Sequence, residues 1–432
     1  MDTAPPGKII RDPLWNTIRL DATALRIVDT AEFQRLRYIR QLGWTHLVYP
    51  GATHTRFDHA LGVHHLTVEA LRHLRERGGV PPEVWEGEEL VPYAALLHDI
   101  GHYAFSHALE ELEADRMPGD HEEVGRRFFS SPPLRDALAP LGLTAADRIH
   151  QLISGASDLP LRGLVSGSLD LDKMEYLRRD ARFCGVPYGE VDVPRLLQAL
   201  VLVPDPETGR YEIGVHEKGV AALESLLFAK YQMFRNVYWH HAVRAATALY
   251  KRIVEDAVRV GLIDPEELVG PTDEELLLEI GRRAFEDDGE VAGRIASRWL
   301  PALRHRKLPK RALELTAADL SGRTVEDWAI GDSPWKRAVE DDLALEVGLQ
   351  PGEVMIDFPV KAAMFQLDLL MERRDGRVER LGAEGVSGLV DLPKVAQELY
   401  RTSRVLRVFT LERRQVAAEQ VLERITRRVE AG

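Results

Sequence analysis

The sequence has little of what directs a protein out of the cell or into a membrane. Among its 432 residues only Cys184 is a cysteine, so no internal disulfide can form and the fold does not depend on an oxidising compartment. The first residues, MDTAPPGKII, lack a basic segment followed by an apolar run. No apolar stretch approaches the roughly 20 residues that span a bilayer. We therefore expect a cytoplasmic protein without a membrane segment.

Excess positive charge is also absent. The 56 Lys and Arg residues are outnumbered by 69 Asp and Glu residues, which gives a formal net charge of -13 at pH 7. This balance disfavours a broad surface for the phosphate backbone of nucleic acid, so we do not expect nucleic acid as a partner. Local basic pockets that bind small anions remain compatible with it.

A helical pattern is present instead, and it changes to a mixed one along the chain. Apolar residues recur at helical spacing from about residue 22 to 250. Residues 29–43 predict one helix with Asp29 as its N-cap, Glu32 as the capping-box partner and Gly43 at its end. The stretch VLVPDPETGRYEIG, residues 201–214, predicts a β-hairpin.

Shorter elements follow after about residue 255. The stretches VMIDFPV and SRVLRVFTL predict strands, and VAAEQVLERITRRV predicts a helix. The whole pattern predicts a mostly α-helical fold: an all-helical core with a small β-hairpin over residues 1–255, and a smaller mixed α/β region over residues 256–432.

Three separate stretches place histidines and carboxylates where they can meet. In LVPYAALLHDIGHYAFSH, residues 90–107, an apolar helical run ends in His98 and Asp99. His59 shares a helix face with Val63, one turn later, so it belongs to a buried stripe. Asp172 begins a polar stripe on a third helix, with Tyr176 and Asp180 at successive turns.

Each of these residues fits a simpler role when it is taken alone. A single histidine is more often a hydrogen-bonded core residue, and a polar stripe is often only solvated. Together, His59, His98, Asp99 and Asp172 suit one divalent transition metal such as Mn, Fe, Zn or Ni, with positions left for water or a phosphate oxygen.

Further imidazoles cluster beside this set. His102, His107 and His121 can bind a phosphate or exchange protons with a leaving oxygen near neutral pH.

The ordered stretches RFDH, LLHDIGHYAFSH and LDLDKMEYLRRD resemble the motifs of HD-domain metal-dependent phosphohydrolases. More specifically, they are similar to the deoxynucleoside triphosphate triphosphohydrolases, both the bacterial dGTP-activated enzymes and the mammalian enzyme that joins a sterile-alpha-motif domain to an HD domain. The similarity is continuous from Lys8 to about Arg244, patchy as far as Lys310 and weak beyond.

The resemblance implies a role for each matching position. The metal ligands would be the four residues already proposed, and Mg²⁺ would accompany the nucleotide triphosphate. The residues that match the group beside the α-phosphate are His102, His107, Glu110 and His121, with His121 as the proton donor. The residues that match the triphosphate and sugar contacts are Gln41, Arg56, Lys173, Tyr176, Asp180 and Arg235. Val243 departs from the pattern, because the mammalian enzyme has a pocket tyrosine there.

The family also implies a purine-nucleotide effector, dGTP or GTP, bound between subunits of a homo-oligomer, usually a tetramer and otherwise a dimer. The positions that match the effector contacts are Lys8, Asp29, Gln34, Arg37, Arg306 and Lys310. The C-terminal region would contribute effector contacts and oligomerisation. Two of these positions also fit purely structural roles, because Asp29 can cap a helix and Arg37 can be a solvated helix residue.

The expected function is therefore hydrolysis of a dNTP to deoxynucleoside and inorganic triphosphate. Another HD phosphohydrolase activity, such as that of a nucleotidase or a phosphodiesterase, is the nearest alternative, and the identity of the product distinguishes it. A nucleotide sensor without catalysis is the alternative from a different class.

Overall fold

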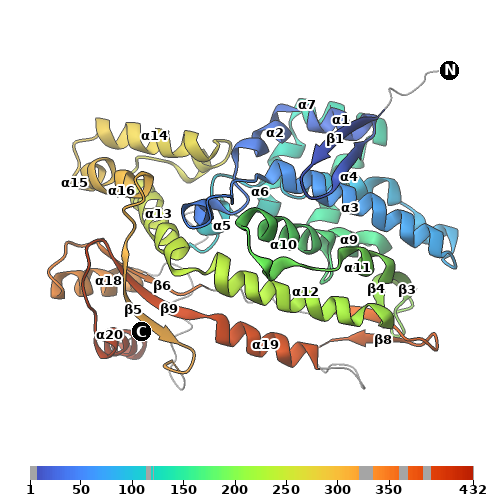
Figure 1. Cartoon of the computed structure of the whole chain (residues 1–432). Coiled ribbons are helices and arrows are strands. Elements are labelled where there is room, and N and C mark those ends of the chain that lie inside the picture. The colour runs from blue at the N-terminus through green and yellow to red at the C-terminus, as the bar shows by residue number, and fades with distance from the viewer. Residues whose placement is uncertain are drawn as a thin grey trace.

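The computed structural model describes residues 7–112, 118–119, 121–320, 334–359, 368–382 and 391–431. Helices dominate it, as the sequence predicts, and three small sheets accompany them (Figure 1). The helices of the first 260 residues are α1 (Ala22–Val28), α2 (Ala31–Gln34), α3 (Arg56–Arg77), α4 (Val91–Leu97), α5 (Ser106–Leu109), α6 (His121–Phe129), α7 (Pro132–Leu138), α8 (Ala145–Ile153), α9 (Gly163–Ser166), α10 (Leu171–Cys184), α11 (Val193–Ala199), α12 (Val220–Met233) and α13 (His241–Arg259).

The later part of the chain alternates helices and strands. Its helices are α14 (Asp273–Glu286), α15 (Glu290–Arg294), α16 (Leu300–Arg304), α18 (Pro334–Glu346), α19 (Leu392–Ser403) and α20 (Ala418–Ala431). The strands of the whole chain are β1 (Lys8–Asp12), β2 (Asn16–Leu20), β3 (Leu200–Pro204), β4 (Tyr211–His216), β5 (Lys310–Thr316), β6 (Val354–Asp357), β7 (Leu369–Glu372), β8 (Val378–Leu381) and β9 (Val405–Thr410). The two predicted C-terminal strands and the final helix are thus confirmed.

Helix α3 is the central element of the helical core. It begins with a capping box, in which the Thr55 backbone N–H donates to Asp58 at 3.0 Å, and it ends at Gly78, whose φ is 69°. Its apolar residues pack against α4 and α10. The predicted stripe is confirmed, because His59 and Val63 are both buried. The core of the protein therefore surrounds the helix that carries His59.

The predicted hairpin is confirmed as β3 and β4, which pair antiparallel. Strand β7 then pairs with β4 in parallel, so the hairpin is part of a four-stranded sheet in the order β3-β4-β7-β8. A second sheet, β5-β9-β6, is three-stranded, and β1 with β2 forms a separate hairpin. Residues far apart in the sequence therefore share one sheet.

The prediction of one helix over residues 29–43 is wrong. Thr30, not Asp29, is the N-cap of α2, because its hydroxyl accepts from the Phe33 N–H and its backbone is extended. Asp29 has helical dihedral angles and is the C-cap of α1. Helix α2 ends at Gln34, and Gly43, with φ of 47°, begins a 3₁₀ turn rather than ending a helix.

Helix α13 connects the parts of the molecule. It contacts α5 of the helical core, α16, and strands β5 and β6 of the three-stranded sheet. In Figure 1 it runs from the α15–α16 pair down towards α12. Within the described residues, no helix is both long enough and apolar enough to cross a membrane.

Candidate active site and metal centre

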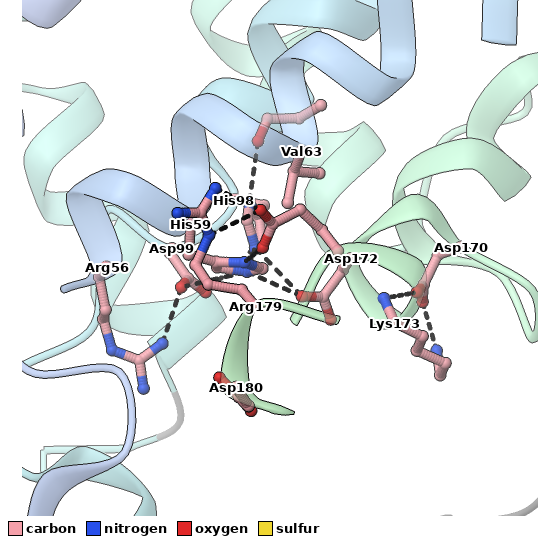
Figure 2. Close-up of polar contacts among 12 residues, drawn as sticks. Arg56, His59, Val63, His98, Asp99, Asp170, Asp172, Lys173, Arg179 and Asp180 are labelled. Carbon is pink, nitrogen blue, oxygen red and sulfur yellow. Dashed lines mark hydrogen bonds and ion pairs between the residues drawn. The ribbon is translucent and has the colours of Figure 1, made fainter. Parts of the chain in front are cut away.

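The predicted metal-ligating side chains meet where three helices converge. His59 comes from α3, His98 and Asp99 directly follow α4, and Asp172 lies in the first turn of α10. The His59 Nε2 atom lies 3.2 Å from His98 Nε2 and 2.9 Å from an oxygen of Asp172 (Figure 2). One donor atom from each of these three residues lies within 4.8 Å of the others.

Asp99 borders this cluster. One of its oxygens lies 3.3 Å from His98 Nε2 and the other lies 3.9 Å from His59 Nε2. Donor atoms that surround one ion at about 2.1 Å stand about 3 to 4 Å apart, which is the spacing found here. Two imidazoles and two carboxylates therefore fit a divalent metal.

The Nδ1 atoms of His98 and His59 already donate hydrogen bonds. His98 Nδ1 donates to the Ala95 carbonyl at 2.8 Å, and His59 Nδ1 donates to Glu175 at 2.7 Å. Both Nε2 atoms are thus left to face the cluster with their lone pairs, as metal ligation requires. Burial would lower the pKa of His59, but its bonds to Asp172 and Glu175 outweigh burial and raise it to about 10. Metal binding at His59 Nε2 would therefore compete with protonation of this nitrogen.

Sequence reasoning missed the support behind His59. Glu175 is fully buried, and besides His59 it accepts from Arg179 Nε at 2.7 Å and Trp15 Nε1 at 2.9 Å. Arg179 in turn donates to Asp12 at 3.0 Å. The available signal was the position of Glu175, three residues after Asp172 on the same helix and therefore on a neighbouring face.

Arg56 contacts a predicted ligand rather than open solvent. It is 2% exposed, and its guanidinium donates to Asp99 at 2.7 Å (Figure 2). The other Asp99 oxygen lies 3.1 Å from His102 Nε2. Burial would raise the pKa of Asp99, but His98, Arg56 and His102 hold it well below its usual range. Asp99 is therefore kept ionised.

The predicted histidine group is assembled around Glu110. The carboxylate lies 3.0 Å from His107 Nδ1 and 3.1 Å from His121 Nδ1. The His121 ring stacks on His102 with centroids 3.9 Å apart and planes 13° apart. Burial, together with the charges of Arg56 and His121, lowers the pKa of His102 well below its usual value. His102 is thus neutral near pH 7, while His107 and His121 share one carboxylate.

One cavity of about 840 Å³ joins these groups to most of the predicted substrate contacts. The predicted site residues that line it are Gln41, Arg56, His98, Asp99, His102, His107, Glu110, His121, Asp172, Lys173, Tyr176 and Asp180. His59 lies behind this surface, fully buried.

The predicted sugar contacts Asp180 and Gln41 and the predicted triphosphate contact Lys173 differ in their hydrogen bonds. Asp180 lies 2.7 Å from His54 Nε2 and accepts from the Tyr238 hydroxyl at 2.5 Å. Gln41 has a buried Oε1 atom without a hydrogen-bond partner in the described part of the chain. Lys173 donates to Asp170 and, at 3.1 Å, to the Gly167 carbonyl.

Arg235 is not brought to the cavity. It is exposed and donates to the Tyr231 hydroxyl at 2.7 Å, while its neighbour Phe234 lines the cavity. It lies at the start of a turn of π-helix over Phe234–Tyr238, which the helical pattern does not predict. The extra residue in such a turn changes the direction of the side chains around it.

The predicted effector residues form two groups. The first group lies in the N-terminal part of the chain, where Lys8 is on β1 and Asp29 follows α1. In this group Gln34 donates to the Val28 carbonyl at 2.7 Å and accepts from Arg37, whose guanidinium lies over the Phe57 ring. The second group is Arg306 and Lys310, which line a separate cavity of about 520 Å³ with Arg311, Arg413 and His241. In Figure 1, β1 and α1 lie at the upper right, whereas α16 and β5 lie on the left.

Two family profiles match the chain. The HD domain matches residues 56–170, and the HD associated region matches residues 191–427, which is more than half of the chain. The first covers both the RFDH and the HD stretches, and the second covers α11 to α20.

Relatives and a solved structure agree with these matches. Protein MJ1154 of Methanocaldococcus jannaschii is 36% identical over 267 residues, which is 62% of this chain and 53% of that protein. The deoxynucleoside triphosphate triphosphohydrolase SAMHD1 of Bos taurus is 30% identical over 268 residues, 54% of this chain and 44% of that protein. The chain thus spans about half the length of these relatives.

The fold itself recurs in a crystal structure. A phosphohydrolase from Bacteroides thetaiotaomicron superposes with a TM-score of 0.71 at 22% identity, over 93% of this chain and 100% of that one. With the matched regions and the His and Asp cluster in place, the chain belongs to the HD-domain phosphohydrolase family.

Proposed function

We propose that the protein is a metal-dependent dNTP triphosphohydrolase that releases deoxynucleoside and inorganic triphosphate. One observation supports the proposal most strongly: a single cavity is lined by three of the four proposed metal ligands (His98, Asp99 and Asp172), by the histidine group around Glu110, and by predicted substrate contacts that include Lys173. The similarity to SAMHD1, whose name states this activity, supports the same substrate class.

Residues of the chain have separate roles in the proposed reaction. When bound at the His and Asp cluster, a divalent ion supplies Lewis-acid polarisation of a phosphate oxygen and lowers the pKa of an attacking water. Lys173 neutralises charge on the phosphate oxygens, and Arg56 holds Asp99 in its ionised form. The water oxygen bonds to the α-phosphorus and releases a proton to solvent, and the bond from this phosphorus to the 5′ oxygen breaks. His121, oriented by Glu110, donates a proton to the departing 5′ oxygen.

At the predicted sugar end of the cavity, Gln41 offers a hydrogen-bond acceptor. The buried Gln41 Oε1 can accept from a sugar hydroxyl, which would satisfy an atom that has no partner in the described residues. Tyr176 and Asp180 line the same region, and Asp180 is fixed by His54 and Tyr238.

The two groups of effector positions support regulation at an inter-subunit site. Arg306 and Lys310 line a cavity to which Lys8, Asp29, Gln34 and Arg37 do not contribute, and in this proposal a second copy of the chain brings the two groups to one guanine nucleotide. A homo-oligomer, a tetramer or a dimer, follows from this proposal.

Product analysis tests the activity. The protein is incubated with each dNTP and rNTP, alone and mixed, with Mg²⁺ or Mn²⁺, and the products are separated by ion-exchange chromatography. We expect deoxynucleoside with intact triphosphate, and no turnover by Asp172→Ala. Monophosphate products would indicate a nucleotidase or phosphodiesterase instead.

Light scattering with dGTP or GTP tests the effector site. We expect a larger particle and turnover of other dNTPs only when the guanine nucleotide is present. Assembly on guanine nucleotide without turnover of any dNTP would indicate a sensor rather than an enzyme.

A further inference from the structure

Helix α13 holds the segment that carries His107 and Glu110. The Tyr250 hydroxyl donates to the Ala104 carbonyl at 3.3 Å, and the Tyr250 ring lies 4.7 Å from that of Phe105. Phe105 has a positive φ of 51°, which a residue with a side chain adopts only when its surroundings hold it there. The conformation of residues 104–111 therefore depends on contacts with α13.

The strongest of these contacts is a buried guanidinium. Arg244 on α13 donates from both terminal nitrogens to Glu111, at 2.8 and 2.7 Å. It also donates to both oxygens of Asp357, at 2.9 and 2.5 Å. Lys251, two turns further along α13, donates to Glu111 at 2.9 Å. One arginine thus bridges two carboxylates from distant parts of the chain, and this planar fork is a geometry that lysine cannot reproduce.

The Glu111 carboxylate is held in its ionised form. Burial would raise the pKa of Glu111, but the charges of Arg244 and Lys251 outweigh it and hold the pKa well below its usual range. Asp357 is 1% exposed and is the last residue of β6. A buried carboxylate that loses its cation is left uncompensated, so each member of this cluster constrains the others.

Glu110 and Glu111 are neighbours that face different partners. Glu110 lies against His107 and His121, whereas Glu111 lies against Arg244 and Lys251. A displacement of Glu111 therefore moves the backbone that sets the Glu110 carboxylate. Because the cluster includes Asp357, this backbone is also fixed to a strand of the three-stranded sheet.

We propose that Arg244 is a positioning residue of the reaction: through Glu111 it fixes the backbone of Glu110 and the histidines it holds, and through Asp357 it connects them to the C-terminal sheet. This inference rests on the proposed function for the roles of Glu110 and His121. It also assigns a part in the reaction to the region after residue 320.

Arg244→Lys tests the inference, because it keeps the charge and removes the fork. The matched control is Arg252→Lys: Arg252 lies on the same helix, is 4% exposed and pairs with the buried Glu340 of α18 instead of with Glu111. We expect R244K to lower kcat by about 10- to 100-fold with KM little changed, and R252K to keep the wild-type kcat. Hydrogen exchange over residues 104–112 should accelerate in R244K and not in R252K.

The two measurements separate failure of this inference from failure of the proposed function. Wild-type kcat and unchanged exchange in R244K would overturn the positioning role. Absence of dNTP hydrolysis by the wild-type protein would overturn the proposed function, and the exchange comparison alone would then decide whether Arg244 holds the segment. If R244K does not fold, Glu111→Gln replaces it, with the same expected fall in kcat and rise in exchange.

Discussion

At the residue scale, the candidate metal centre depends on groups outside the proposed ligand set. His59 can present its Nε2 lone pair to a metal because Glu175 accepts the hydrogen bond from its Nδ1–H, and Glu175 stays ionised because Arg179 and His59 are bonded to it. Burial would raise the pKa of Glu175, but these two partners lower it to about 2. The carboxylate behind the ligand therefore fixes both the tautomer and the orientation of the imidazole.

Glu175→Gln should weaken the metal site. The amide keeps nearly the same shape but loses the charge that orients His59, so we expect metal affinity to fall by about 10- to 100-fold. Titration against a competing chelator measures it. The control is Glu340→Gln, which neutralises another buried, arginine-paired carboxylate outside the site. Equal metal affinity in both variants would contradict the role of Glu175.

A second buried carboxylate gives a pH-dependent prediction. Asp273 is 2% exposed, and burial raises its pKa to about 6, although the Arg40 backbone N–H and side chain oppose the shift. Because the folded pKa lies above the ordinary value of 3.8, the unfolded chain releases this proton first as the pH rises. Stability should therefore fall between about pH 4 and 6, by about 3 kcal/mol from this group.

Urea unfolding of wild type and Asp273→Asn across this range measures the effect. The free energy of unfolding of the variant should rise relative to wild type as the pH increases from about 4 to 6 and then level off. Asp288→Asn, which removes an exposed carboxylate, is the control. A D273N difference curve that matches the curve of this control would mean that burial does not raise the pKa of Asp273.

At the element scale, the site depends on how closely α3 and α10 approach. Gly62 lies at their contact, and a Cβ atom there would be 2.0 Å from Glu175 Oε1. The sequence alone does not show that the group approaching Gly62 is the carboxylate behind His59. Periodicity places side chains on helix faces, and it does not give the partner across the interface.

Gly62→Ala should therefore damage both the packing and the metal site. Glu175 cannot move aside without breaking its bonds to His59 and Arg179, so we expect a loss of about 1–3 kcal/mol in the free energy of unfolding, together with weaker metal binding. Thermal unfolding and the chelator titration measure the two effects.

Gly293→Ala in α15 is the control, since no atom lies within 4 Å of the added Cβ. It should be neutral or stabilising by up to about 1 kcal/mol. If G62A behaves in the same way, the contact between α3 and α10 does not limit the site.

Local elements were predictable where their signals were local. The α3 terminus at Gly78, the β3–β4 hairpin and helix α20 follow from glycine, turn and periodic patterns. The helix predicted over residues 29–43 fails because Asp29 and Thr30 are adjacent and both can cap. The buried Thr30 hydroxyl also donates to the Ile27 carbonyl, an interaction that the sequence pattern does not contain.

At the scale of the whole molecule, the associations that complete the fold join distant segments. Strand β7 pairs with β4 more than 150 residues earlier in the chain, and Asp357 meets Arg244. Such pairings depend on tertiary packing rather than on local propensity. Sequence reasoning grouped His59, His98, Asp99 and Asp172, whose donor atoms lie close together in the structure. It could not separate Arg235 from the cavity, because the π-helical turn that contains Arg235 leaves no local signal.

The fate of the oxygen atom from water tests the proposed reaction most directly. The metal-loaded protein hydrolyses a dNTP in water enriched in oxygen-18, and mass spectrometry examines both products. We expect one heavy oxygen in inorganic triphosphate and none in the deoxynucleoside, because water attacks the α-phosphorus and the bond to the 5′ oxygen breaks. Label in the deoxynucleoside, or in orthophosphate or pyrophosphate, would contradict this reaction.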